Sequence, residues 1–170
     1  MDWEKLEQEC IQIVQDSLKE ILAEKEIYTA ALYTDNSAGS ISFGANTMKN
    51  FKAKIIEEDA ITKEDIAYDQ WAPDEWDLEG YNIERFREIN KQLFNSIMHE
   101  KKDFDLFFEK TTNLMIECLK KVKDQLGSEL KDTILFVTVT DDDFAEELEN
   151  KSAQCINHPE VAKIFMGRYD

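Results

Sequence analysis

The stretch at residues 133–140, Thr-Ile-Leu-Phe-Val-Thr-Val-Thr, constrains the fold of this chain more than any other segment. It is apolar on both alternations over most of its length, which is typical of a strand buried on both faces. A strand tolerates this pattern only where helices or other layers cover both of its faces. We therefore expect residues 133–140 to form the central strand of a covered sheet.

Further strands are expected earlier in the chain. Residues 27–45 read as an antiparallel hairpin, because two runs rich in Ile, Tyr, Phe and Thr flank the turn-forming residues 35–39. Residues 66–71 read as a third strand, which Pro73 closes. The predicted fold is α+β, with a central mixed, largely antiparallel sheet of about four strands.

Helical periodicity predicts the layers that cover this sheet. Apolar residues recur every three or four positions from about residue 2 to 24, which predicts a long amphipathic helix. A helix at 82–99, with Asn82 as N-cap, and another at 103–126 are expected to form an antiparallel pair. Short helices are expected at 47–58, 146–151 and 160–166. The helix at 47–58 should turn four apolar side chains inward: Met48, Phe51, Ile55 and Ile56.

Nothing in the sequence suggests more than one domain. At 170 residues, with 42% hydrophobic residues, the chain is long and apolar enough for a packed core. No internal repeat, low-complexity tract or linker divides it. We therefore predict a single globular domain over residues 1–170.

The charge of the chain is concentrated in two segments. The net charge is −17, from 37 acidic and 20 basic residues. Residues 57–79 hold ten acids and one base, and residues 141–149 hold six acids and no base. Local acidity of this kind attracts cationic partners and repels nucleic acid and anionic membranes. We therefore expect a basic protein partner, and neither nucleic acid nor a membrane.

The sequence also indicates where the protein is located and the redox state of its cysteines. Residues 1–4 lack the positive charge and apolar run of a signal peptide, and no stretch approaches the ~20 apolar residues of a membrane span. The odd number of widely spaced cysteines, Cys10, Cys118 and Cys155, favours reduced thiols over a disulfide framework or a zinc site. We expect a cytoplasmic protein.

Motifs for cofactors and catalysis are weak. The spacing of Gly39 and Gly44 imitates a phosphate-binding loop, but Ala45-Asn46 stands where the motif requires Lys and Ser or Thr. The two histidines, His99 and His158, each lack a metal-ligand partner nearby in the sequence. We therefore expect no cofactor and assign no catalytic residue.

The acids after the expected central strand form the most reactive-looking cluster. Asp141, Asp142 and Asp143 follow the strand end, where open sheets place ligands and where a hard cation finds oxygen atoms. The alternative interpretation is a helix N-cap, with negative charge at the positive end of the helix dipole. The metal interpretation would make the chain a divalent-metal-dependent hydrolase or phosphotransferase, with Asp141 and Asp143 as ligands.

Two tryptophans lie among acids in the other segment. Trp71 ends the expected third strand and should lie over the core, whereas Trp76 follows Pro73 among carboxylates and is expected to be exposed. Tryptophan is enriched in interface hot spots, and neighbouring acids can pair with Lys or Arg of a partner. The candidate binding residues are Trp71, Asp74, Glu75, Trp76, Asp77 and Glu79.

Three short motifs resemble a family of small, acidic, uncharacterised bacterial proteins. They are Ala45-Asn46-Thr47, a W-x-x-x-E-W motif at residues 71–76, and a helix that carries Phe86 and Asn90. The resemblance covers nearly the whole chain, but only the tryptophan motif is specific. It implies no established enzyme activity, and related small acidic proteins often serve as immunity proteins encoded beside secreted toxins.

Three hypotheses follow. The first is a non-enzymatic intracellular binding protein, an immunity protein that blocks a cationic, nuclease-type bacterial toxin through segments 57–79 and 141–149. The second is the metal-dependent enzyme that uses Asp141 and Asp143. The third is a homo-oligomer whose acidity serves only solubility; the sequence does not determine the oligomeric state.

Overall fold

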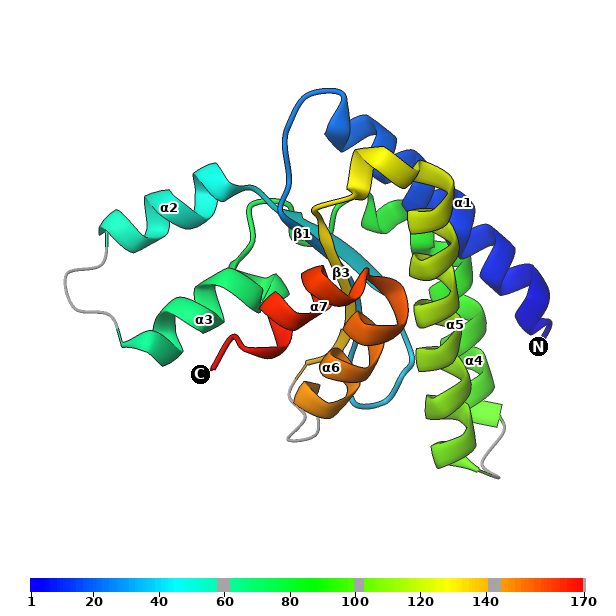
Figure 1. Ribbon diagram of the computed structural model, residues 1–170. Helices are drawn as coiled ribbons and strands as arrows, with labels where there is room; N and C mark the ends of the chain where they lie inside the picture. Colours follow the sequence, from blue (N-terminus) through cyan, green and yellow to red (C-terminus); the bar gives the residue numbers. More distant parts are fainter. Residues whose placement is uncertain (58–61, 100–102, 141–144, 170) are drawn as a thin grey trace.

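The computed structural model describes residues 1–57, 62–99, 103–140 and 145–169. These residues form seven α-helices and three strands, arranged as a sheet with helices on both faces (Figure 1). The mixed α+β class is therefore confirmed. None of the helices in this part of the chain is both long and apolar enough to cross a membrane.

The sheet has three strands, in the order β2–β1–β3. β1 (Thr29–Thr34) pairs antiparallel with β2 (Ser42–Asn46) and parallel with β3 (Ile134–Val139). The hairpin predicted at 27–45 is confirmed. The strand predicted at 133–140 is present, but it lies at an edge and β1 takes the centre. The prediction of a central position was wrong because helices cover both faces of β3. This strand therefore buries its side chains without a neighbouring strand on each side.

Side chains from helices close both edges of the sheet. On β3, the Asn157 amide bonds the backbone N and O of Leu135 at 2.9 and 2.6 Å, and the Ser152 hydroxyl bonds those of Val137 at 2.9 and 3.2 Å. On the other edge, the amide of Asn90 bonds the backbone N and O of Ile41 at 2.7 and 3.1 Å. Backbone groups that a fourth strand would have paired are thus satisfied.

Three helices cover one face of the sheet: α1 (Trp3–Leu22), α4 (Arg87–His99) and α5 (Phe104–Leu126). α4 and α5 run in opposite directions, as predicted (Figure 1). The helix that packs most closely on α5 is nevertheless α1, and the ring centroids of Trp3 and Phe107 lie 5.7 Å apart. The prediction that α4 and α5 pack directly on each other is thus corrected, since the long apolar stripe of α1 contacts both helices.

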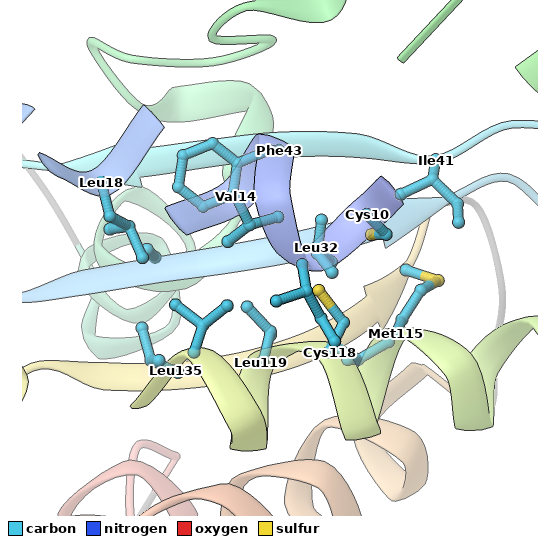
Figure 2. Close-up of a cluster of buried hydrophobic side chains, with 14 of the residues drawn as sticks. Cys10, Val14, Leu18, Leu32, Ile41, Phe43, Met115, Cys118, Leu119 and Leu135 are labelled. Atoms are coloured by element: carbon cyan, nitrogen blue, oxygen red, sulfur yellow. The ribbon is translucent and has the colours of Figure 1, made fainter. Parts of the chain in front are cut away.

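The core on this face joins side chains of the helices to those of the sheet. Figure 2 shows Val14 and Leu18 of α1, Leu119 of α5 and the strand residues Leu32 and Phe43 gathered in one cluster, and all five side chains are fully buried. Burial of each such side chain contributes about 1.5–3 kcal/mol. Of the three free cysteines, Cys10 and Cys118 lie in this core and Cys155 is exposed. Burial raises the pKa of the Cys118 thiol.

The second face packs against the C-terminal helices α6 (Ala145–Ile156) and α7 (Pro159–Met166). The rings of Phe136 and Phe165 lie 4.5 Å apart at the centre of this layer. Both helices were predicted, although α6 is longer than expected because Ser152 and Asn157 hold its second half and its end against β3.

The start of the predicted helix at 82–99 needs correction. It begins as a 3-10 turn, η2 (Ile83–Phe86), before α4. Asn82 has a left-handed backbone with φ of 56° and makes no capping hydrogen bond; its amide donates instead to Ser17 and Glu20, each at 3.0 Å. The C-terminus of α5 is as predicted, because Gly127 adopts a positive φ of 45°.

Residues 48–57 and 62–75 form an arm that extends away from the core, made of α2 (Met48–Glu57), α3 (Lys63–Trp71) and the 3-10 turn η1 (Pro73–Glu75) (Figure 1). No residue of helix α2 is fully buried, and the predicted inward packing is wrong for Met48 and Ile56, which are 38% and 81% exposed. Phe51 does face inward, with its ring centroid 6.1 Å from that of Tyr28. The strand predicted at 66–71 is also wrong, because this segment is helix α3. A capping box between Thr62 and Asp65 starts that helix and lowers the pKa of the Asp65 carboxyl through hydrogen bonds from Thr62.

Candidate functional site

The two tryptophans of residues 71–76 are buried and hold the arm against the sheet. Trp71 packs edge-on against Tyr28 and Phe165, with ring centroids 5.7 and 5.0 Å apart. Trp76 packs edge-on against Phe136 at 5.9 Å and donates its indole N–H to the backbone oxygen of Gln70. The core position predicted for Trp71 is confirmed.

The exposed position predicted for Trp76 is wrong, since only 5% of this residue is accessible. The reason is the 3-10 turn η1. It reverses the chain after Trp71, so that the ring of Trp76 returns to the sheet while Asp74 stays at the surface. A buried tryptophan therefore does not draw its acidic neighbours inward.

Gly44 explains why the segment after Trp76 can lie so close to the sheet. Leu78 forms an isolated bridge with Ala45 of β2, and the Ala45 N–H donates to the Leu78 oxygen at 3.3 Å. A Cβ atom on Gly44 would lie 3.3 Å from that oxygen and 3.4 Å from the Trp76 ring. Because Gly44 has no Cβ atom, the segment after Trp76 can pack closely on β2.

The acids around these tryptophans form a surface of mixed exposure. We call it the acidic surface and define it as residues 62–79, which include α3, η1 and the segment that follows. Asp69, beneath it, is buried, and the side chains of Glu75 and Asp77 are 29% and 27% exposed. As whole residues, Glu64, Asp65, Asp74, Asp77 and Glu79 are exposed on it.

Two lysines from outside the segment partly neutralise the acidic surface. Lys54 of α2 forms ion pairs with Glu75 and, at 3.8 Å, with Asp69. Lys25 pairs with Asp77 at 3.6 Å. Residues 62–79 carry seven carboxylates and Lys63, so the two outside lysines leave four negative charges in excess.

A polar network joins the acidic surface to the end of β2. The Tyr28 hydroxyl donates to the Gln70 oxygen at 2.6 Å and accepts from the Asn46 amide at 3.0 Å. Thr47 follows, and its hydroxyl donates to Asp77 at 3.4 Å. Burial raises the pKa of Tyr28, so this hydroxyl stays protonated at physiological pH. The network fixes the position of the arm relative to the sheet.

A hollow of about 620 Å³ lies beside this network, between the start of α2 and the chain before β1. Its lining carries both signs of charge, with Lys25 and Lys49 opposite Glu24 and Asp77. Such a lining does not favour a simple anion or cation. We therefore treat the hollow as the margin of the acidic surface.

The described part of the second acidic segment, residues 145–149, lies at the other end of the sheet. Asp77 contacts Thr47, next to the first residue of β1, whereas α6 follows the last residue of β3, which runs parallel to β1. Glu146 and Glu147 are exposed there. Glu149 is engaged within the fold, because it accepts from Thr138 at 2.6 Å and pairs with Arg168 at 2.7 Å. The two segments therefore do not form one continuous acidic face.

The candidate metal ligands Asp141 and Asp143 lie outside the described residues. Within residues 1–57, 62–99, 103–140 and 145–169, no three His, Cys, Asp or Glu side chains are grouped so that they could hold a metal ion.

Two residues of the acidic surface were missed from sequence. Tyr68 is 51% exposed on α3 and donates its hydroxyl to Asp74 at 2.6 Å. Lys54 lies on a different helix from the carboxylates that it neutralises. The spacing of Thr62 and Asp65, typical of a capping box, could have identified α3 and with it the position of Tyr68. The contact between Lys54 and Asp69 is tertiary and leaves no local signal.

Comparison with known proteins gives one match. Residues 8–158 match a family model described as "Domain of unknown function (DUF4303)". No curated protein and no solved structure matches the chain.

Proposed function

The chain belongs to the DUF4303 family, and we propose that it is a non-enzymatic binding protein that takes up a basic protein partner on its acidic surface. The observation that carries this proposal is the exposure of carboxylates on the acidic surface, whose two tryptophans are buried. The tryptophans fix α3 and η1 against the sheet, and the acids of this segment face solvent. A preorganised charged surface loses less free energy on binding than a flexible one.

The charge excess gives this surface a role in association. The four negative charges in excess over residues 62–79 create a local field, within a chain of net charge −17. Such fields raise association rates with oppositely charged partners by about 10 to 10³ at low salt. Binding should therefore weaken steeply as the salt concentration rises.

Tyr68 supplies the exposed aromatic group that Trp76 does not. Its ring stands beside Asp74 on the outer side of α3 and is half exposed. Tyrosine, like tryptophan, is enriched in interface hot spots. We propose that Tyr68 and the exposed acids contact the partner, while Trp71 and Trp76 act only through the position of the arm.

We propose a cationic bacterial toxin with a nuclease-type active site as the partner, blocked in the cytoplasm. Support comes from the resemblance to small acidic immunity-like proteins and from the charge of the acidic surface. A nuclease site is basic because it binds phosphates, so a dense set of carboxylates is complementary to it. Segment 141–149 has a lesser part in this proposal, since Glu149 is engaged internally.

The test compares two triple variants that each remove three acids. Glu64→Gln, Asp74→Asn and Glu79→Gln neutralise the acidic surface; Glu4→Gln, Glu117→Gln and Asp124→Asn neutralise exposed acids on α1 and α5. Association with the catalytic domains of the source strain's own basic toxins is measured by stopped flow at several salt concentrations. We expect the first variant to associate about tenfold more slowly or worse at low salt. Equal rates for the two variants would falsify the proposed surface.

A further inference from the structure

Asp69 is a buried carboxylate that the fold does not satisfy. It lies on α3, beneath the acidic surface, and its side chain is only 8% exposed. None of the described residues donates a hydrogen bond to its Oδ2 atom. A buried acceptor without a donor costs free energy, and such groups call for a specific explanation. An incoming donor would remove that cost.

The only cation paired with Asp69 among the described residues serves it poorly. The Nζ atom of Lys54 hydrogen-bonds Glu75, but it lies 3.8 Å from Oδ1 of Asp69, too far for a hydrogen bond. One ammonium group therefore faces two carboxylates and donates to only one of them. The side chains of Lys54 and Glu75 are each 29% exposed, so solvent, and a partner, can reach this group.

The helix that carries Lys54 is weakly held. No residue of helix α2 is fully buried, whereas α3 beneath it is fixed by Trp71. Elements with few buried apolar contacts open locally at a low cost in free energy. Lys54 can therefore leave Glu75 without disruption of the sheet or its core.

We infer that Asp69 and Glu75 form a recognition site for one basic side chain of the partner, and that Lys54 fills this site in the free protein. This inference rests on the proposed function and adds an internal competitor to it. Arginine is the favoured occupant, because its planar fork carries five N–H donors and can bond both carboxylates at once. The ammonium of Lys54 has three donors and leaves Oδ2 of Asp69 empty.

The experiment uses fluorescein-labelled hexaarginine and hexalysine peptides as probes, with affinity measured by fluorescence anisotropy. Lys54→Met removes the internal ligand. Lys52→Met is the matched control, because it removes the same charge from an exposed position on the same helix. If Lys54 fills the site about nine-tenths of the time, its removal tightens hexaarginine binding about tenfold. The gain should exceed that of Lys52→Met and should be smaller for hexalysine.

Asp69→Asn in the Lys54→Met background should return the affinity to that of the Lys52→Met control. Glu75→Gln provides a second, half-exposed position if the Asp69 variant has a lowered melting temperature. Equal affinities of Lys54→Met and Lys52→Met would overturn the inference. If the triple variant of the acidic surface still weakens peptide binding in that case, the proposed function survives alone; if it has no effect either, both fail.

Discussion

The helical core and the arm are built from the same chain by opposite means. Helix α5 buries nine of its 23 residues against α1 and the sheet, whereas α2 buries none of its ten. The arm is attached to the sheet through the two tryptophans and hydrogen bonds such as that from Tyr28 to Gln70, whereas the Lys54 ion pairs join α2 to the rest of the arm. Because apolar burial provides most of the folding free energy, stability is concentrated in the core. The arm is left free to carry charge, which a core cannot do.

The largest expected effect on stability comes from the two tryptophans that attach the arm to the sheet. We expect Trp76→Ala and Trp71→Ala each to lower the free energy of unfolding by about 3–5 kcal/mol, as truncation of buried aromatic side chains does. Both rings pack on the sheet's second face, so both should count as core despite their acidic neighbours. Urea denaturation measures the loss. A Trp76→Ala protein as stable as the wild type would place that ring outside the core.

A matched pair of aliphatic truncations compares the two regions directly. Leu119→Ala removes a fully buried side chain of α5 and should cost about 2–5 kcal/mol. Ile56→Ala removes a side chain that is 81% exposed on α2 and should change stability by no more than about 0.5 kcal/mol. Amide hydrogen exchange should likewise be faster along α2 than along α5. Equal costs for the two variants would show that α2 is packed in solution.

The smallest expected effect concerns how each region holds a lysine. Lys54 pairs with carboxylates, whereas Lys123 of α5 donates to the Thr133 oxygen and the Asn157 side chain, each at 2.7 Å. Burial lowers the pKa of Lys123 from 10.5 to about 8.

Between these values the unfolded chain holds a proton that the folded chain has lost, so stability should rise with pH. Measured by urea denaturation from pH ~7.5 to ~9.5, the stability of the wild type should rise relative to Lys123→Met. A constant difference between the two proteins across that window would contradict the shift.

The sequence predicts regular, strongly patterned elements well and tertiary contacts poorly. The hairpin and the strand at 133–140 follow from apolar alternation, and the long N-terminal helix from its periodicity. The segment 66–71 misled because six residues rich in Ile, Tyr and Trp suit a strand, while the helix depends on a cap at Thr62.

The candidate site shows the same division. Its acids were found from composition, since charge clusters are local. The prediction that Trp76 is exposed was wrong because a single 3-10 turn points that ring toward the sheet and leaves its acidic neighbours pointing outward. The contact of Lys54 with the acids depends on how α2 and α3 pack, which no short motif encodes, whereas the capping box of α3 could have indicated the position of Tyr68.

The amides of Asn90 and Asn157 have a consequence for how this protein can assemble with others. A bare strand edge is a template onto which another chain can add a strand, and repeated addition produces fibres. Here the edge-facing backbone groups of Ile41 and Leu135 are already paired with side chains of the same chain, and Leu78 occupies a further position beside β2. The sheet thus ends within the molecule at those positions. Self-association by strand addition is blocked there, and a partner must be recognised through side chains.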